Sequence, residues 1–87
     1  YAEAFYSLGS IQLQNQTWLD ALESFKKSAE ANRSYANAYY GAGLSFMALG
    51  NNKEAEQMFT YARDLFEYQR NQEWVNRSNS LLQQVSS

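Results

Sequence analysis

Hydrophobic residues recur along most of the chain at spacings of three and four, the period of an amphipathic α-helix. The first such segment covers residues 2–14, and the second runs from about 18 to 31. Another apolar stripe runs from 52 to about 68, and a last one covers 71–86. No segment alternates with period two, and proline is absent. The pattern therefore predicts an all-α chain.

The central segment, residues 34–50, has a different pattern. It carries apolar or small side chains on nearly every side of the predicted helix. A helix that is apolar all round is normally buried, so we expect neighbours on both sides of it. Gly50 should close this helix, since glycine enters the left-handed conformation without steric cost. Polar residues before the helices are predicted to cap them through their side chains, namely Thr17, Ser34 and Asn51.

The chain resembles itself when Tyr1 is aligned with Tyr35. At this offset Tyr1, Ala2, Ala4, Tyr6, Gly9, Ala21 and Phe25 recur as Tyr35, Ala36, Ala38, Tyr40, Gly43, Ala55 and Phe59. A glycine inside a helix costs about 1 kcal/mol relative to alanine, so a helix is expected to lie close against Gly9 and Gly43. Chance similarity of two amphipathic helices is the alternative, which the shared offsets of glycine, alanine and phenylalanine disfavour.

A helix–turn–helix unit repeated at this offset resembles the tetratricopeptide repeat, whose pattern reads W-x2-L-G-x2-Y, then A-x3-F, then P. The first unit reads Phe5-x2-Leu8-Gly9, then Ala21-x3-Phe25. The second reads Tyr39-x2-Ala42-Gly43-x2-Phe46, then Ala55-x3-Phe59.

The chain departs from the family pattern at three positions. Gln12 replaces the tyrosine of the first unit, and Arg33 and Glu67 stand where proline would end the second helices. Without proline these helices are free to run longer, and we expect the fourth helix to do so, to about Tyr68.

The resemblance implies one domain over residues 1–87, an α-α superhelix (solenoid) of two units, 1–34 and 35–68, with a capping helix at 71–86. Two registers of that helix are open. Strict continuation of the repeat aligns Trp74 with Tyr6 and Tyr40 but puts Arg77 at the glycine position. Shifting the alignment by one residue instead puts Ser78 at the glycine position. We prefer this register because a small residue then aligns with the small residues of the two units.

In this family the first helix of each unit lines a concave groove that holds an extended peptide or a partner helix. Carried onto this chain, the resemblance assigns the groove to Glu3, Tyr6, Ser10, Leu13, Asn37, Tyr40, Leu44, Met47 and, in the last helix, Trp74. Tyr6 and Tyr40 would be neighbouring aromatic anchors, the residue class enriched at binding hot spots. The alternative is that both tyrosines only cover the groove wall and touch neighbouring helices.

Many relatives grip a C-terminal carboxylate with lysine, arginine and asparagine. The equivalent positions here, Tyr6, Ser10 and Tyr40, are not basic. The resemblance therefore implies a ligand that is apolar or rich in aromatic residues, and not one of the carboxylate-clamp type.

The amino-acid composition disfavours several classes of function. The 7 basic and 9 acidic residues leave a net charge of −2, which does not suit binding to nucleic acid. Histidine and cysteine are absent, which removes the commonest general base and sulfur chemistry. The acidic pairs Asp20/Glu23 and Glu54/Glu56 lie near predicted helix starts, where acids complement the helix dipole. We expect no catalytic site, no metal site and no cofactor.

No apolar run approaches the roughly 18 residues of a membrane span, and no signal peptide opens the chain. We therefore expect a cytoplasmic protein without a membrane partner, and the start at Tyr1 indicates a fragment or a processed piece. The favoured function is a protein–protein interaction module that is not itself an enzyme. The alternative is self-association, through the ends of the helix stack or the stripe of the fifth helix.

Overall fold

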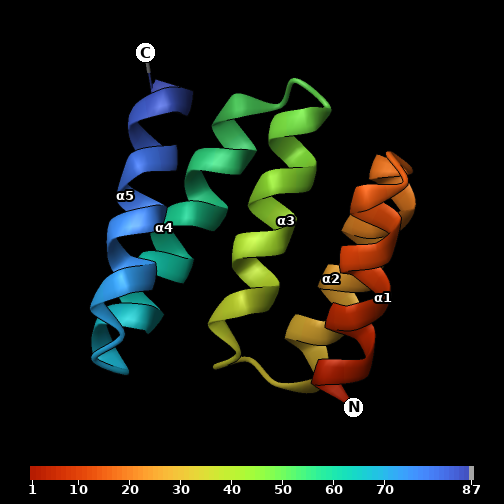
Figure 1. Cartoon of the computed structure of the whole chain (residues 1–87), viewed down its shortest axis with the longest axis horizontal. Helices are drawn as coiled ribbons and strands as arrows, with labels where there is room; N and C mark the ends of the chain where they lie inside the picture. The colour runs from red at the N-terminus through yellow and green to blue at the C-terminus, as the bar shows by residue number, and fades with distance from the viewer. Residues whose placement is uncertain (87) are drawn as a thin grey trace.

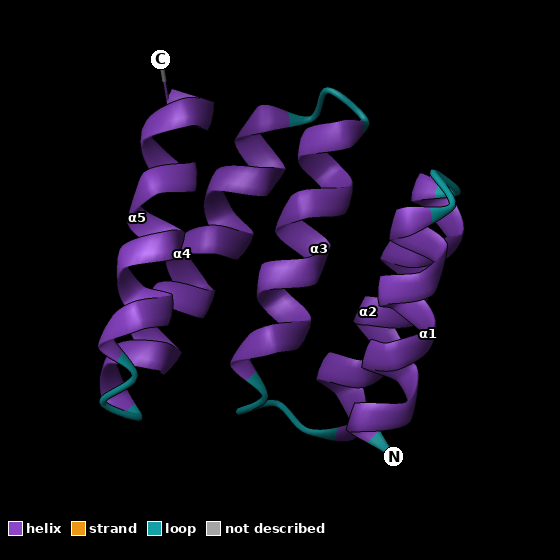
Figure 2. Cartoon of the chain, viewed as in Figure 1, coloured by secondary structure: helices purple, strands orange, loops and turns teal. Residues whose placement is uncertain are grey.

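A computed structural model describes residues 1–86 of the 87-residue chain. The described part consists of α-helices joined by short turns and has no strand (Figures 1 and 2), which confirms the all-α class. The helices are α1 (Ala2–Gln14), α2 (Trp18–Ala31), α3 (Ala36–Ala48), α4 (Asn52–Tyr68) and α5 (Gln72–Ser86).

Each helix packs against the next one in the chain, and α1 also packs against α3. The helices form a row in which α1 lies at one end and α5 at the other, with α2 and α4 behind (Figure 1). The central helix α3 contacts α1, α2 and α4, and its small residues are buried: Ala36, Ala38, Gly41, Ala42, Gly43 and Ser45. The prediction of a helix buried from several sides is confirmed.

Two core clusters lie on either side of α3. The N-terminal core cluster consists of Ala21, Leu22, Phe25 and Ala42, with half-buried residues such as Tyr6 and Leu13 packed on it. The C-terminal core cluster consists of Ala36, Ala62, Phe66 and Val75, bordered by Tyr39, Tyr40, Leu65 and Trp74. Because α3 supplies residues to both, it joins the two halves of the molecule.

Glycines allow phenylalanine rings to lie directly on helix backbones. A Cβ on Gly9 would lie 2.8 Å from the ring of Phe25, and one on Gly43 would lie 2.6 Å from Phe59. The close approach expected at both glycines is confirmed. The Phe25 ring also lies against Gly41, a contact that the sequence repeat does not reveal because Gly41 has no glycine counterpart in the first unit.

The turns after α1, α3 and α4 share one backbone geometry. The residue two positions beyond each helix has a positive φ: 64° at Gln16, 82° at Gly50 and 60° at Arg70. The next N–H then donates to the carbonyl five residues earlier, as in Thr17 N–H to Gln12 O at 3.0 Å. These are Schellman-type helix ends, and the prediction for Gly50 is confirmed.

The predicted side-chain caps are wrong. Thr17 and Asn51 do precede α2 and α4, but neither side chain makes a capping hydrogen bond. The Thr17 hydroxyl instead donates to Gln12 O at 2.9 Å, because the preceding helix end brings that carbonyl beside it. Helix α3 follows Tyr35 and not Ser34.

Buried serines tie neighbouring helices together. Ser28 of α2 donates to Ala2 O of α1 at 2.7 Å, and Ser24 donates to the side-chain oxygen of Gln12 at 2.5 Å. Gln12 thus accepts a hydrogen bond from a hydroxyl that is itself buried.

Helix α5 also has a buried serine, which bears on its two registers. Ser78 of α5 is fully buried and its hydroxyl donates to Trp74 O, whereas Arg77 is exposed. A buried small residue at this point favours the register that puts Ser78 at the glycine position.

Candidate binding face

The nine predicted groove residues lie on α1, α3 and α5, the helices nearest the viewer in Figure 1. We call the surface they form the α1–α3–α5 face. Glu3 is exposed, and the other eight side chains are all half-buried: Tyr6, Ser10, Leu13, Asn37, Tyr40, Leu44, Met47 and Trp74. Each of these eight therefore contacts the protein and still reaches solvent.

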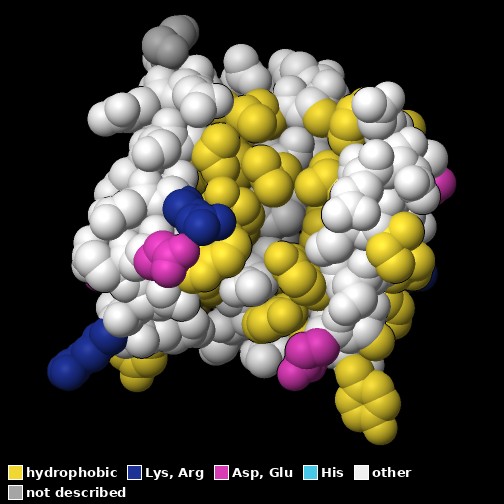
Figure 3. All heavy atoms as spheres, viewed as in Figure 1, with side chains coloured by type: hydrophobic (Ala, Val, Ile, Leu, Met, Phe, Trp, Pro, Cys, Tyr) yellow, Lys and Arg dark blue, Asp and Glu magenta, His cyan; other side chains and the backbone are white. Residues whose placement is uncertain are grey.

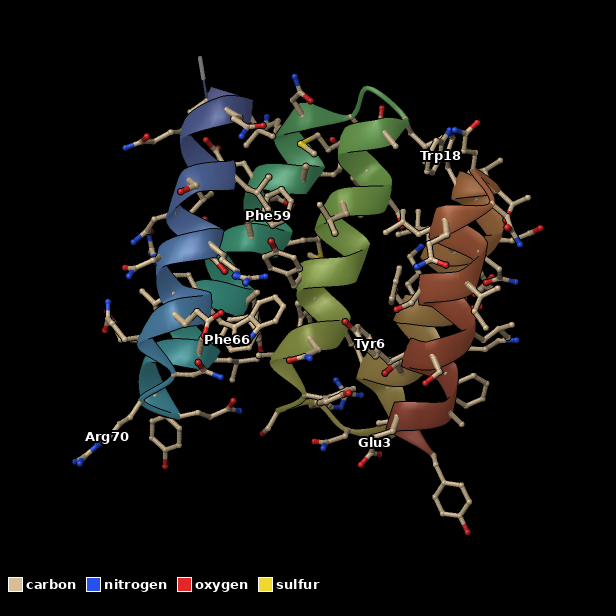
Figure 4. The ribbon with its side chains drawn as sticks, in the orientation of Figure 1. Glu3, Tyr6, Trp18, Phe59, Phe66 and Arg70 are labelled. Carbon is tan, nitrogen blue, oxygen red and sulfur yellow. The ribbon has the colours of Figure 1, made fainter. Side chains whose placement is uncertain are left out.

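The Tyr6 ring packs against two other aromatic rings. Its centroid lies 5.7 Å from that of the buried Phe25, and the ring of Tyr35 meets it edge-on at 5.6 Å. Figure 4 shows Tyr6 projecting from α1 into the space toward α3, with Glu3 one turn away. Tyr6 is thus fixed by packing and keeps part of its surface in solvent.

Tyr40 is the centre of an aromatic group at the α3–α5 side of the face. Its ring meets Trp74 edge-on at 5.2 Å and Phe59 at 5.7 Å, and Trp74 in turn stacks on Phe66 at 5.6 Å. Edge-to-face pairs at such distances are favourable aromatic contacts. Tyr6 and Tyr40 make no ring contact with each other in the described residues, so each is held by its own partners.

The hydroxyls of both tyrosines remain available to a ligand. No side chain or backbone group of residues 1–86 forms a hydrogen bond with the hydroxyl of Tyr6 or Tyr40. Burial raises the pKa of Tyr40, an effect that nearby Arg77 partly opposes. Burial also raises the pKa of Tyr35. Tyr40 therefore keeps its proton at neutral pH and can donate a hydrogen bond as well as accept one.

The remaining residues of the face divide into two kinds. Leu13 packs on the N-terminal core cluster, and the Ser10 hydroxyl donates to Tyr6 O at 2.9 Å, so both have structural partners. Asn37, Leu44 and Met47 are half-buried on α3. They offer an amide, a branched aliphatic side chain and an adaptable thioether.

Two residues of the face were missed by the sequence argument. Tyr35 lies against Tyr6, and the guanidinium of Arg77 lies 4.7 Å from the ring centroid of Trp74. Arg77 also pairs with Glu73 at 3.0 Å. The spacing of Trp74 and Arg77 on one helix could have indicated the cation–π contact. The place of Tyr35 depends on how the turn before α3 folds.

Hydrophobic side chains gather along the middle of this face, between more polar surfaces over α1 and α5 (Figure 3). An apolar pocket lies elsewhere, between α2 and α4 with α3 as its floor. It has a volume of about 260 Å³ and is lined by Leu22, Phe25, Lys26, Ala29, Glu30, Ala38, Tyr39, Ala42, Phe46 and Met58. None of the nine predicted residues lines this pocket.

No helix in the described part of the chain is both long and apolar enough to cross a membrane. Within residues 1–86, no group of acidic side chains is arranged to hold a metal ion. Comparison with protein-family models, with curated proteins and with solved structures finds no match to this chain.

Proposed function

We propose that this chain is a tetratricopeptide-like superhelical module that binds an extended peptide or a partner helix on its α1–α3–α5 face. It acts by presenting a rigid surface and carries out no chemistry, and we place it in the cytoplasm. The internal sequence repeat supports the family, together with the same glycine–phenylalanine packing in both units, Gly9 on Phe25 and Gly43 on Phe59.

The observation that carries the proposal is that Tyr40 is held in place by packing and still reaches solvent. Its ring is fixed by Trp74 and Phe59, yet it is only half-buried and its hydroxyl has no partner in residues 1–86. A pre-organised aromatic side chain loses little conformational entropy on binding, and tyrosine is typical of binding hot spots. Tyr6, Leu44 and Met47 extend the same surface along α1 and α3.

The charges of the face support an apolar ligand over an acidic C-terminus. Arg77 is the cation beside Tyr40, and Glu73 already pairs with it. Glu3 adds a negative charge near Tyr6 and Tyr35. A free carboxylate would therefore meet one shared cation and an opposing acid, whereas an apolar side chain would meet Tyr40, Leu44 and Met47.

The test is selection of peptides from a random library displayed on phage, followed by titration into the protein with amide chemical shifts recorded by NMR. We expect peptides rich in apolar and aromatic residues that shift α1, α3 and α5. Leu44→Glu should weaken binding by about tenfold or more, equivalent to about 1.4 kcal/mol. Gln57→Glu, an exposed change on α4, should leave affinity unchanged. Peptides that shift only the α2–α4 pocket, or that require a free acidic C-terminus, contradict the proposal.

A further inference from the structure

The α2–α4 pocket exists because α2 and α4 both pack on α3 and scarcely on each other. Helix α3 contributes the buried alanines Ala38 and Ala42 to its lining, and α2 contributes Ala29. These short side chains leave a space of about 260 Å³ between the two helices. All of the lining residues lie between positions 22 and 58, so the pocket does not depend on either end of the chain.

Aromatic rings line much of the pocket, and they are held in place. Phe25 is buried in the N-terminal core cluster. The Tyr39 ring stacks on Tyr61 with the centroids 4.5 Å apart, and its hydroxyl donates to Arg33 O at 3.1 Å. Met58 adds a thioether, which makes favourable contacts with aromatic rings. A planar ring therefore meets a preformed surface of aromatic side chains and sulfur.

The volume of the pocket limits the size of its occupant. Drug-sized ligands occupy pockets of about 300–1,000 Å³, and the volume of about 260 Å³ lies just below that range. The pocket therefore suits a single ring system and is too small for a long acyl chain.

Two charged residues of opposite sign also line the pocket, Lys26 and Glu30, one turn apart on α2. Both are exposed, and within residues 1–86 neither side chain forms an ion pair or a hydrogen bond. Lysine four residues before glutamate is the less favourable order for an ion pair along a helix, so both charges are open to a ligand. A ligand with one charge would meet one like charge here, whereas a ligand that carries both signs beside its ring would meet two opposite charges.

We propose that the α2–α4 pocket binds a free aromatic amino acid. Its ring lies against Ala38 and Ala42, its carboxylate contacts Lys26, and its ammonium group contacts Glu30. Because exposed ion pairs contribute little, burial of the ring supplies most of the affinity, and the two charges select the zwitterion. The pocket shares no residue with the α1–α3–α5 face, so one molecule can bind the amino acid and a peptide at once.

The test is titration of the protein with L-tryptophan, followed by amide chemical shifts in NMR. We expect shifts at the pocket-lining residues and a dissociation constant of about 1 mM, as is reasonable for a small ligand at an open site. Three relatives keep the indole ring but lack one or both charges: tryptamine, indoleacetate and N-acetyl-tryptophanamide. Each should bind several-fold more weakly. N-acetyl-tryptophanamide represents a tryptophan inside a polypeptide, so it distinguishes the free amino acid from a side chain of a partner protein.

Matched variants of α2 test the two charges and the space between the helices. Lys26→Gln/Glu30→Gln should lower the affinity for L-tryptophan to that for N-acetyl-tryptophanamide. Glu23→Gln/Lys27→Gln changes exposed residues outside the pocket and should leave the affinity unchanged. Ala29→Leu puts a larger side chain into the pocket and should abolish binding of all four compounds. Each variant is first shown by circular dichroism to be equally helical.

Several outcomes overturn the proposal. They are the absence of shifts at the pocket with L-tryptophan, equal or tighter binding of any of the three relatives, a preference for the zwitterion that survives Lys26→Gln/Glu30→Gln, and ring binding that survives Ala29→Leu. Peptide binding to the α1–α3–α5 face is followed at α1 and α5, which contribute no residue to the pocket. The two proposals can therefore fail separately.

Discussion

The two units of the chain are built on one pattern but end differently. Helix α2 ends at Ala31 after 14 residues, whereas α4 runs to Tyr68 over 17 residues, as the absence of proline led us to expect. The additional turn carries Phe66, which is buried against Trp74, while its counterpart in the first unit is the exposed turn residue Asn32. The additional residues of α4 thus supply a buried ring against α5, and α2 supplies no such ring at the equivalent position.

The difference extends to the cores. The N-terminal core cluster has one fully buried aromatic ring, Phe25, which lies between glycines of α1 and α3. In the C-terminal half, Phe66 joins Tyr40, Trp74 and Phe59 in an aromatic group that connects three helices. The first half is held by close backbone approach, and the second half is held more by ring contacts.

The largest expected effect comes from removing the ring that distinguishes the second unit. Phe66→Ala should destabilise the protein by about 3–5 kcal/mol, because it empties a fully buried site and removes the ring on which Trp74 stacks. The measurement is urea unfolding followed by tryptophan fluorescence.

The matched control for this change is Asn32→Ala. It removes only an exposed hydrogen bond from the Ser34 N–H, and should therefore change stability by less than about 1 kcal/mol. Equal losses at Phe66 and Asn32 would mean that the two helix ends are equivalent after all.

A smaller effect is expected where the two units are most alike. Gly43→Ala should cost about 1–3 kcal/mol, since the new Cβ would lie 2.6 Å from the buried Phe59 ring. Gly9→Ala meets Phe25 at 2.8 Å and should cost somewhat less. Thermal unfolding by circular dichroism gives the order. If either substitution raised the melting temperature, as glycine replacement does in an unobstructed helix, the close packing described at these sites would be wrong.

The smallest effect concerns the turns. Gln16 and Gly50 occupy equivalent positions of the two units and have the same left-handed conformation, which is costly for any residue but glycine. Gln16→Gly should therefore stabilise the protein by up to about 1 kcal/mol, seen as a higher urea midpoint. Gln57→Gly, at an exposed position inside α4, should instead destabilise it by about 1 kcal/mol. A loss at both sites would show that the turn gains nothing from glycine.

The helices could be predicted from the sequence because their apolar periodicity is local, and the close approach at Gly9 and Gly43 because it recurs at a fixed offset. The lack of side-chain caps at Thr17 and Asn51 could not be predicted. Both follow Schellman-type ends, where backbone groups satisfy one another and the hydroxyl of Thr17 is used by the helix before it. Residue type alone does not distinguish these situations.

The candidate face was predictable only in part for a similar reason. The positions on α1 and α3 were assigned from the resemblance to the tetratricopeptide repeat, and spacing adds only that those on one helix share a side. The placing of the Arg77 charge near Tyr40 and the packing of Tyr35 on Tyr6 depend on how separate segments of the chain meet. The α2–α4 pocket is lined by residues from three helices, so no pattern within one helix indicates it.

The row arrangement also governs how the molecule folds and how it carries force. Helices contact mainly their neighbours in the chain, so the native contacts are largely local and few long loops need closing, which favours rapid folding. The two described ends of the chain lie at opposite ends of the row (Figure 1). Tension applied between these ends would pull on the helix interfaces in series. The helices would therefore separate one interface at a time, the weakest interface first.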